Sequence, residues 1–141
     1  MTRTTRGGTD PGAVGSFQQY MEHGPPAIAV TRGVGHTLEF ANQSFRRLTR
    51  VVAADVGRPI AGSVRGRPAS GLLATLDHVF RSGAVARDVS IADGGDGVPQ
   101  WRCTVWPQLG ASDRPERLVI ELWESSEADL TLALQDRKSV V

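Results

Sequence analysis

The segment that decides the fold is residues 85–123, which read VARDVSIADGGDGVPQWRCTVWPQLGASDRPERLVIELW. Three runs within it predict strands over Val85–Asp93, Pro99–Pro107 and Arg117–Trp123. A Gly-rich link over residues 94–97 joins the first two runs and favours a hairpin. No helical pattern separates the three runs, so we expect an antiparallel meander. The last run is apolar at nearly every position, which indicates a central strand covered on both faces.

The residues before this segment predict a hairpin followed by helices. Ala27–Thr31 and His36–Ala41 alternate with period two and are joined by a Gly-containing loop. A short helix is expected after Asn42, and the Gly and Pro residues over 51–71 allow only single helical turns. Apolar residues at helical spacing then predict a longer helix over 70–81, ended by Gly83. This order of elements predicts an α+β domain.

The sequence divides into four parts. Residues 1–15 are predicted to be a flexible tail, and residues 16–24 a flanking helix with Ser16 as its N-cap. Residues 25–124 form the predicted domain, and residues 125–141 a C-terminal linker or signalling helix. The spacing of Leu130, Leu134 and Val141 is compatible with the start of a coiled coil or with a frayed end.

Basic and acidic residues are nearly equal in number. The 141 residues carry a formal net charge of +1, which favours neither nucleic acid nor an anionic membrane as a partner. Arginines cluster over residues 46–67, but no aromatic residues are interleaved for base stacking, so a solvated face or a surface for an acidic partner is expected. The sequence lacks an apolar run long enough for a signal or a membrane span, and we expect a cytoplasmic location.

Several short motifs, in order along the chain, resemble the PAS family. They are Pro26–Val30, Glu39–Phe45, Val56–Arg58, Leu76–Gly83, Trp101–Pro107 and Leu118–Glu127. The resemblance implies a five-stranded antiparallel sheet with short helices and one longer helix on its inner face, enclosing a ligand pocket. It also implies that the terminal helices pass a signal to a kinase or cyclase. The sequence departs from the family at Glu124-Ser125-Ser126-Glu127, where many members have Asp-Ile-Thr-Glu.

The alternation of apolar residues assigns the inner face of the sheet. We expect it to comprise Ile28, Val30, Leu38, Phe40, Val89, Ile91, Trp101, Cys103, Val105, Ile120 and Leu122, closed by Phe45, Leu48, Ile60, Leu72, Leu76 and Phe80 from the helices. The candidates for a ligand pocket are Phe40, Phe45, Leu48, Ile60, Leu76, Phe80, Val89, Trp101, Cys103, Val105 and Leu122. The same residues would also serve as a plain core. Asn42 resembles the family's common Asn, whose side chain fixes the strand-to-helix turn.

No cofactor is predicted. Flavin-binding LOV members use a Cys just after the Val-Gly-Arg-like motif, whereas Val56–Ile60 has none and Cys103 falls on a strand. Haem-binding members place a His about ten residues before the Gly that ends the long helix, whereas His78 is only five before Gly83. His23 and His36 have no partners at metal-ligand spacing, so no metal site is expected. A small organic ligand, or a pocket filled by side chains, remains.

The outer face of the sheet is predicted to carry Trp106 and Trp123. Two exposed indole rings would form an unusual apolar patch, which a helix bearing Phe17, Tyr20 and Met21 could cover. The helix could come from the same chain or from a partner, and we expect a homodimer.

The predicted function is that of a sensory or regulatory PAS domain, the input module of a bacterial two-component histidine kinase. The sequence has no kinase motif of its own, so the kinase would be a downstream effector and the chain is not expected to be an enzyme. An alternative is a dimerisation or protein-interaction module without a ligand. A third class, a small hydratase-like α+β enzyme, needs an inward His–Asp pair, and the predicted inner face holds no carboxylate.

Overall fold

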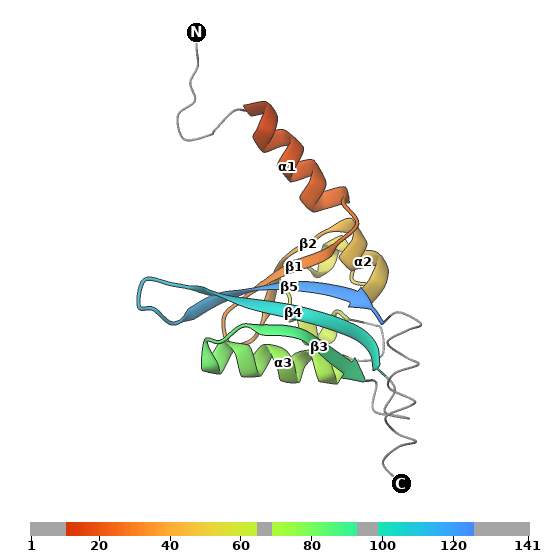
Figure 1. The fold of residues 1–141 in the computed structure, drawn as a ribbon. Coiled ribbons are helices and arrows are strands. Elements are labelled where there is room, and N and C mark those ends of the chain that lie inside the picture. Colours follow the sequence, from red (N-terminus) through yellow and green to blue (C-terminus); the bar gives the residue numbers. More distant parts are fainter. Residues whose placement is uncertain (1–10, 65–68, 93–98, 126–141) are drawn as a thin grey trace.

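The computed structural model describes residues 11–64, 69–92 and 99–125. Five antiparallel strands form one sheet in the order β2-β1-β5-β4-β3, with helices against one face, which confirms the predicted α+β class (Figure 1). In chain order the elements are α1 (Pro11–His23), β1 (Ala27–Arg32), β2 (Thr37–Ala41), α2 (Gln43–Thr49), η1 (Ala53–Asp55), η2 (Ile60–Gly62), α3 (Ala69–Ser82), β3 (Ala86–Ala92), β4 (Pro99–Leu109) and β5 (Pro115–Glu124).

The helices cover what we call the inner face of the sheet. α3 packs across β3, β4 and β5, while α2 packs against β1. Leu72, Leu76 and Val79 of α3 are buried because they recur at helical spacing on the side toward the sheet. Gly83 follows α3 with a φ of +72°, a left-handed conformation that glycine adopts without steric cost. The core therefore lies between α3, α2 and the central strand β5.

The phase of β1 corrects a prediction. The inner face of this strand carries Ala27 and Ala29, which lie opposite the buried Leu122 and Ile120 of β5. Ile28 and Val30, predicted to face inward, lie opposite Glu121 and Val119 on the outer face. Both phases of this strand are apolar, so alternation alone could not choose between them. Alanine on the inner side leaves room for α2 to pack closely on the strand.

Phe40 is a second correction. Leu38 of β2 pairs with Thr31, but Phe40 pairs with Val30, so β2 contains one residue more than β1 between these pairs. Such a bulge reverses the side-chain phase of the strand. Phe40 therefore lies on the outer face, and Ala41 takes the buried position. This pocket candidate is consequently outside the core.

The first helix is longer than predicted. α1 starts at Pro11 rather than after Ser16, so residues 11–15 belong to a helix and not to the predicted tail. Proline fits the first turn of a helix because its missing N–H would have no intrahelical partner there. In Figure 1, α1 projects away from the sheet. The rest of the predicted tail, and the C-terminal helix after Ser125, lie outside the described residues.

Candidate functional site

The predicted pocket residues other than Phe40 gather on the inner side of the sheet. Phe45, Leu76 and Cys103 are fully inaccessible to solvent, and Leu48, Phe80 and Val89 are partly buried against the same cluster. The remaining candidates are also buried there: Ile60, Trp101, Val105 and Leu122. These side chains contact one another as a close-packed core does. A ligand among them would have to displace side chains.

Cys103 reports on the polarity of this core. Its thiol is fully buried on β4, between the central strand and β3. Burial raises the pKa of Cys103 to about 11 because the surroundings do not solvate a thiolate. The thiol is therefore protonated and weakly nucleophilic at neutral pH.

Asn42 joins the core to the flanking helix. Its side-chain oxygen accepts hydrogen bonds from the backbone N–H groups of Ile28 and Phe45, at 3.0 and 2.8 Å. Its amide nitrogen donates to the backbone carbonyls of Met21 and Pro26, both at 2.7 Å. One fully buried side chain thus connects α1, the α1–β1 link, β1 and the N-terminus of α2. A shift of α2 would therefore move the end of α1 through the Asn42 side chain.

Three further contacts tie the end of α1 to α2. The Ser44 hydroxyl donates to the carbonyl of Gly24 at 2.7 Å. The guanidinium of Arg46 pairs with the Glu22 carboxylate at 2.9 Å. His23 Nδ1 and Gln43 Oε1 lie 2.9 Å apart. Because each contact comes from the first turn of α2, this turn and the last turn of α1 form a single polar unit.

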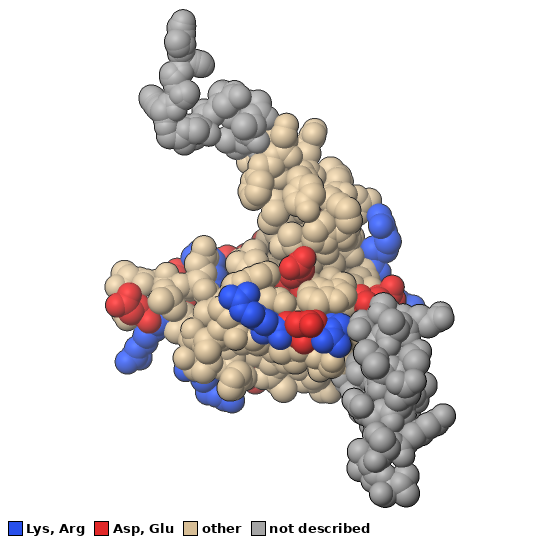
Figure 2. All heavy atoms as spheres, viewed as in Figure 1, with Lys and Arg blue, Asp and Glu red and all other residues tan. Residues whose placement is uncertain are grey.

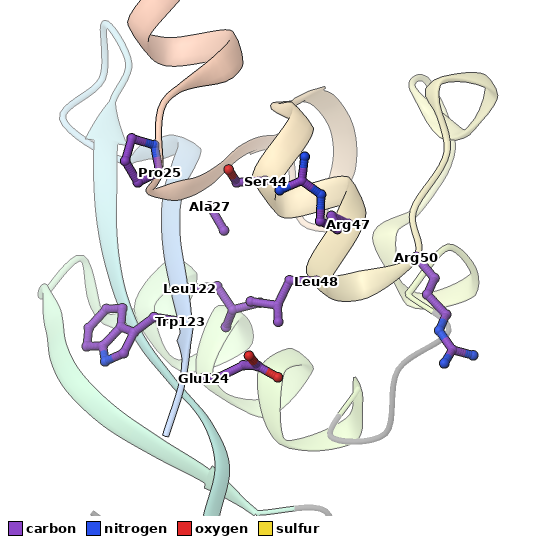
Figure 3. A pocket seen from close by; sticks show the side chains of 9 residues that line it. All are labelled: Pro25, Ala27, Ser44, Arg47, Leu48, Arg50, Leu122, Trp123 and Glu124. Atoms are coloured by element: carbon purple, nitrogen blue, oxygen red, sulfur yellow. The ribbon is translucent and has the colours of Figure 1, made fainter. Parts of the chain in front are cut away.

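A surface groove of about 460 Å³ lies beside this unit, at the start of β1 and the end of β5. Figure 3 shows Leu48 of α2 and Leu122 of β5 pointing toward each other, and Arg50 pointing away from them. We call it the junction groove; its lining residues are Pro25, Ala27, Ser44, Arg47, Leu48, Arg50, Leu122, Trp123 and Glu124. Pro25 leads into β1 and Glu124 ends β5, so the chain enters and leaves the sheet at one place.

The outer face carries the apolar patch expected around Trp106 and Trp123. Register places Trp106 opposite Val119, and Trp123 opposite Arg102. The patch, here the outer-face patch, is larger than predicted because the corrected strands add to it; it comprises Ile28, Val30, Phe40, Trp106, Val119 and Trp123, all partly exposed. On α1, Phe17 and Tyr20 are 62 % and 52 % exposed, and Met21 is partly buried. Within the described residues α1 does not cover the patch.

Ion pairs border the outer-face patch. Glu39 lies between Arg117 and Arg32, with N–O distances of 2.7 and 3.2 Å. The bond to Glu39 raises the pKa of Arg117. Arg102 pairs with Asp88 at 2.6 Å, and this hydrogen bond lowers the pKa of the Asp88 carboxyl. Figure 2 shows acidic and basic side chains next to each other on the visible face. The charges around the patch are therefore of both signs.

The opposite end of β2 contains a pair that sequence reasoning missed. His36 Nε2 lies 2.7 Å from Asp77 Oδ1 of α3, and the His36 ring meets the Phe80 ring edge-on at 5.9 Å between centroids. His36 is 4 % exposed, whereas the Asp77 side chain is 49 % exposed. The two residues are 41 positions apart, so no local pattern could have linked them. His78, by contrast, is exposed on α3.

Over the described ranges the chain has neither a metal-binding cluster nor a membrane-spanning helix. Among residues 11–64, 69–92 and 99–125, no three His, Cys, Asp or Glu side chains come together as a metal site would require. In the same ranges, none of the helices has the length and apolar character needed to cross a bilayer.

Comparison with known proteins gives matches in structure only. No family profile and no curated protein sequence matches the chain. An RNA-binding light-oxygen-voltage receptor matches with a TM-score of 0.61 at 19 % identity, over 99 % of this chain and 41 % of that one. The PAS domain of BvgS from Bordetella pertussis matches with 0.56 at 17 % identity, over 92 % and 99 %. A sensory box sensor histidine kinase from Vibrio cholerae matches with 0.52 at 13 % identity, over 82 % and 94 %.

Strand order, helix placement and these neighbours together define the class: the chain has the PAS fold, as its motifs predicted. It spans less than half the length of the light-oxygen-voltage receptor that it matches.

Proposed function

We propose that this PAS-fold domain is a sensory or regulatory module of a signal-transduction protein, the input module of a two-component histidine kinase. The observation that carries the proposal is the Asn42 junction, in which one buried side chain links α1 to the core through four hydrogen bonds. An event in the core that moves α2 would thereby move α1. The structural likeness to a sensor histidine kinase and to the BvgS PAS domain supports this role.

The proposed partner is a second copy of the chain. The outer-face patch and the exposed Phe17 and Tyr20 of α1 are two apolar surfaces, and each could cover the other in a symmetric dimer. In such a pairing the α1 helix of each copy would lie on the sheet of the other, so a change in one junction would alter the whole assembly. The mixed charges bordering the patch fit a protein partner better than nucleic acid or a membrane.

Light scattering of the purified chain tests the dimer. Tyr20→Asp places a charge on the exposed side of α1 and should reduce the measured mass from that of a dimer to that of a monomer. His78→Asp, an equally simple change on an exposed position of α3, is the matched control and should leave the mass unchanged. An unchanged mass for Tyr20→Asp, or a wild-type chain that is monomeric at high concentration, would contradict this interface.

A chimaera tests the coupling to a kinase. The domain is placed before the catalytic core of a histidine kinase, and autophosphorylation is measured. Ser44→Ala removes one bond of the α1–α2 unit while leaving the core intact, and it should shift the phosphorylation rate by at least threefold in either direction. His78→Ala should not change it. Equal rates for the two variants would contradict transmission through the junction.

The second candidate function is a dimerisation module without a ligand. The dense packing of the inner face supports it, since Phe45, Leu76 and Cys103 leave no accessible surface. We propose no flavin or haem: Cys103 is buried with a raised pKa, and His78 lies at the surface. The chain is proposed to have no catalysis of its own. Native mass spectrometry of the purified domain separates the two functions, because a co-purified small molecule supports sensing.

A further inference from the structure

Two buried polar atoms stand out at the His36 end of the core. Thr31 Oγ1 and His36 Nδ1 are both inaccessible to solvent and have no hydrogen-bond partner among the described residues. Thr31 is 0 % exposed and His36 is 4 % exposed. Buried polar atoms in folded proteins are almost always bonded, because leaving one unpaired costs about 1–3 kcal/mol. Two such atoms in one region therefore point to an occupant that completes their bonding.

The two atoms belong to residues of one hairpin. Thr31 pairs with Leu38, and His36 is the last residue of the β1–β2 turn, two positions before Leu38. Thr31 shares the inner phase of Ala27 and Ala29, and His36 contacts Asp77 and Phe80 of α3, the helix that covers the inner face. Both polar groups thus face the same layer of the core.

A surface groove of about 360 Å³ lies near this pair, although neither Thr31 nor His36 lines it. Its lining includes Arg32 and Gly33, next to Thr31 in sequence, and Phe80, whose ring meets the imidazole of His36. The β4–β5 hairpin supplies the rest of its wall, including Pro115. Pockets of this size hold small organic molecules. Phe80 belongs both to the groove and to the surroundings of His36, so a movement of this one ring would connect them.

The bonding of His36 sets the chemistry of the occupant. The Asp77 carboxylate accepts a hydrogen bond, so Nε2 carries the proton that it shares with Asp77 at 2.7 Å. In the neutral ring, Nδ1 is then an acceptor and needs a donor. The Thr31 hydroxyl can donate or accept. A single hydroxyl group satisfies both, because it can donate to Nδ1 and accept from Thr31.

We infer that this end of the core binds a small, mostly apolar molecule through one hydroxyl group, held between Thr31 Oγ1 and His36 Nδ1, with its apolar part extending past Phe80 into the surface groove. This rests on the proposed sensory role and specifies the ligand class for it. Binding would displace Phe80 from the imidazole and act on α3 through the His36–Asp77 pair. The ligand would thereby exert its effect at the end of β2 opposite Asn42.

The experiment uses phenol as probe and toluene as its counterpart without the hydroxyl, titrated into the full chain and followed by NMR of the imidazole nitrogens. We expect phenol to shift the His36 signals and not those of exposed His23 and His78, and to bind at least tenfold more tightly than toluene. Thr31→Val should reduce the preference for phenol at least fivefold. Thr104→Val, a threonine of the outer face, should keep it.

Three outcomes would overturn the inference: equal binding of phenol and toluene, an unchanged preference in Thr31→Val, or phenol shifts only at His23 and His78. A high-resolution crystal structure with phenol showing a water molecule between Thr31 and His36 would also overturn it. Failure here leaves the dimer and the kinase coupling untouched, because those tests involve neither phenol nor the His36 end.

Discussion

The buried polar side chains at the two ends of β2 differ in how completely they are hydrogen-bonded. Asn42, directly after the strand, uses both atoms of its side-chain amide in four hydrogen bonds. His36, directly before it, has one ring nitrogen paired with Asp77 and the other without a partner among the described residues. A fully bonded buried group fixes geometry, whereas an incompletely bonded one gains from an occupant. In the proposed function, the Asn42 end would transmit a signal and the His36 end would receive it.

The largest effect is expected at the Asn42 end. Asn42→Ala leaves two backbone donors and two carbonyls without this partner, and we expect the free energy of unfolding to fall by about 3–5 kcal/mol. Urea denaturation measures it. Gln43→Ala, at the next and exposed position, is the control and should cost less than about 1 kcal/mol. A loss below about 1 kcal/mol for Asn42→Ala would remove the contrast between the two ends.

The core between the two ends is tested through Cys103. Burial raises the pKa of Cys103 in the folded chain to about 11, so between pH 9 and 11 the folded state keeps a proton that the unfolded state loses. The protonated thiol therefore stabilises the folded state fully below pH 9. As the pH rises toward 11, the free energy of unfolding should fall by about 2–3 kcal/mol. Unfolding measured against pH should show this slope in the wild type and a smaller one in Cys103→Ala. Identical slopes would contradict a closed core.

At the His36 end, the tie to α3 should contribute less. Asp77→Ala removes the partner of His36 Nε2, and because Asp77 is half exposed we expect a loss of about 1–2 kcal/mol. Thermal or urea unfolding measures it, with His78→Ala on the same helix as control. If both variants are equally stable, the His36–Asp77 pair does not hold α3 to the hairpin.

The smallest effect has the opposite sign. Thr31→Val replaces a buried hydroxyl that has no partner among the described residues, and it should stabilise the ligand-free chain by about 0.5–1 kcal/mol. Thr49→Val is the matched control: its hydroxyl donates to the Phe45 carbonyl at 2.7 Å, so this change should destabilise. A loss of stability in Thr31→Val would show that its hydroxyl is already bonded. The contrast with Asn42 would then not extend to Thr31.

The sequence predicted those parts of the fold whose signals are local. α3 was predicted within one residue at either end, because its apolar spacing and Gly83 mark it clearly. The meander of β3 to β5 followed from the absence of helical patterns between its strands. The phase of β1 was wrong because both of its faces are apolar, and Phe40 was misplaced because one bulge residue reverses a strand without any sequence signal.

The candidate site was less predictable for a related reason. Asn42 could be recognised because an N-cap acts on its immediate neighbours, although its bonds to Met21 and Pro26 need the packed helix α1. The His36–Asp77 pair depends on how α3 crosses the sheet, which periodicity does not specify. The start of α1 at Pro11 was missed because Gly12 and Gly15 are poor helix formers.

The pairing of β1 with β5 has a mechanical consequence. Ala27 near the entry to the sheet lies opposite Leu122 near the exit, and the two strands are antiparallel. A pull on both flanking segments would load the hydrogen bonds of this pair one after another, from the Ala27–Leu122 end inward, rather than all together. The domain should therefore yield at low force, and a pull on the residues before β1 and after β5 would part β1 from β5 first.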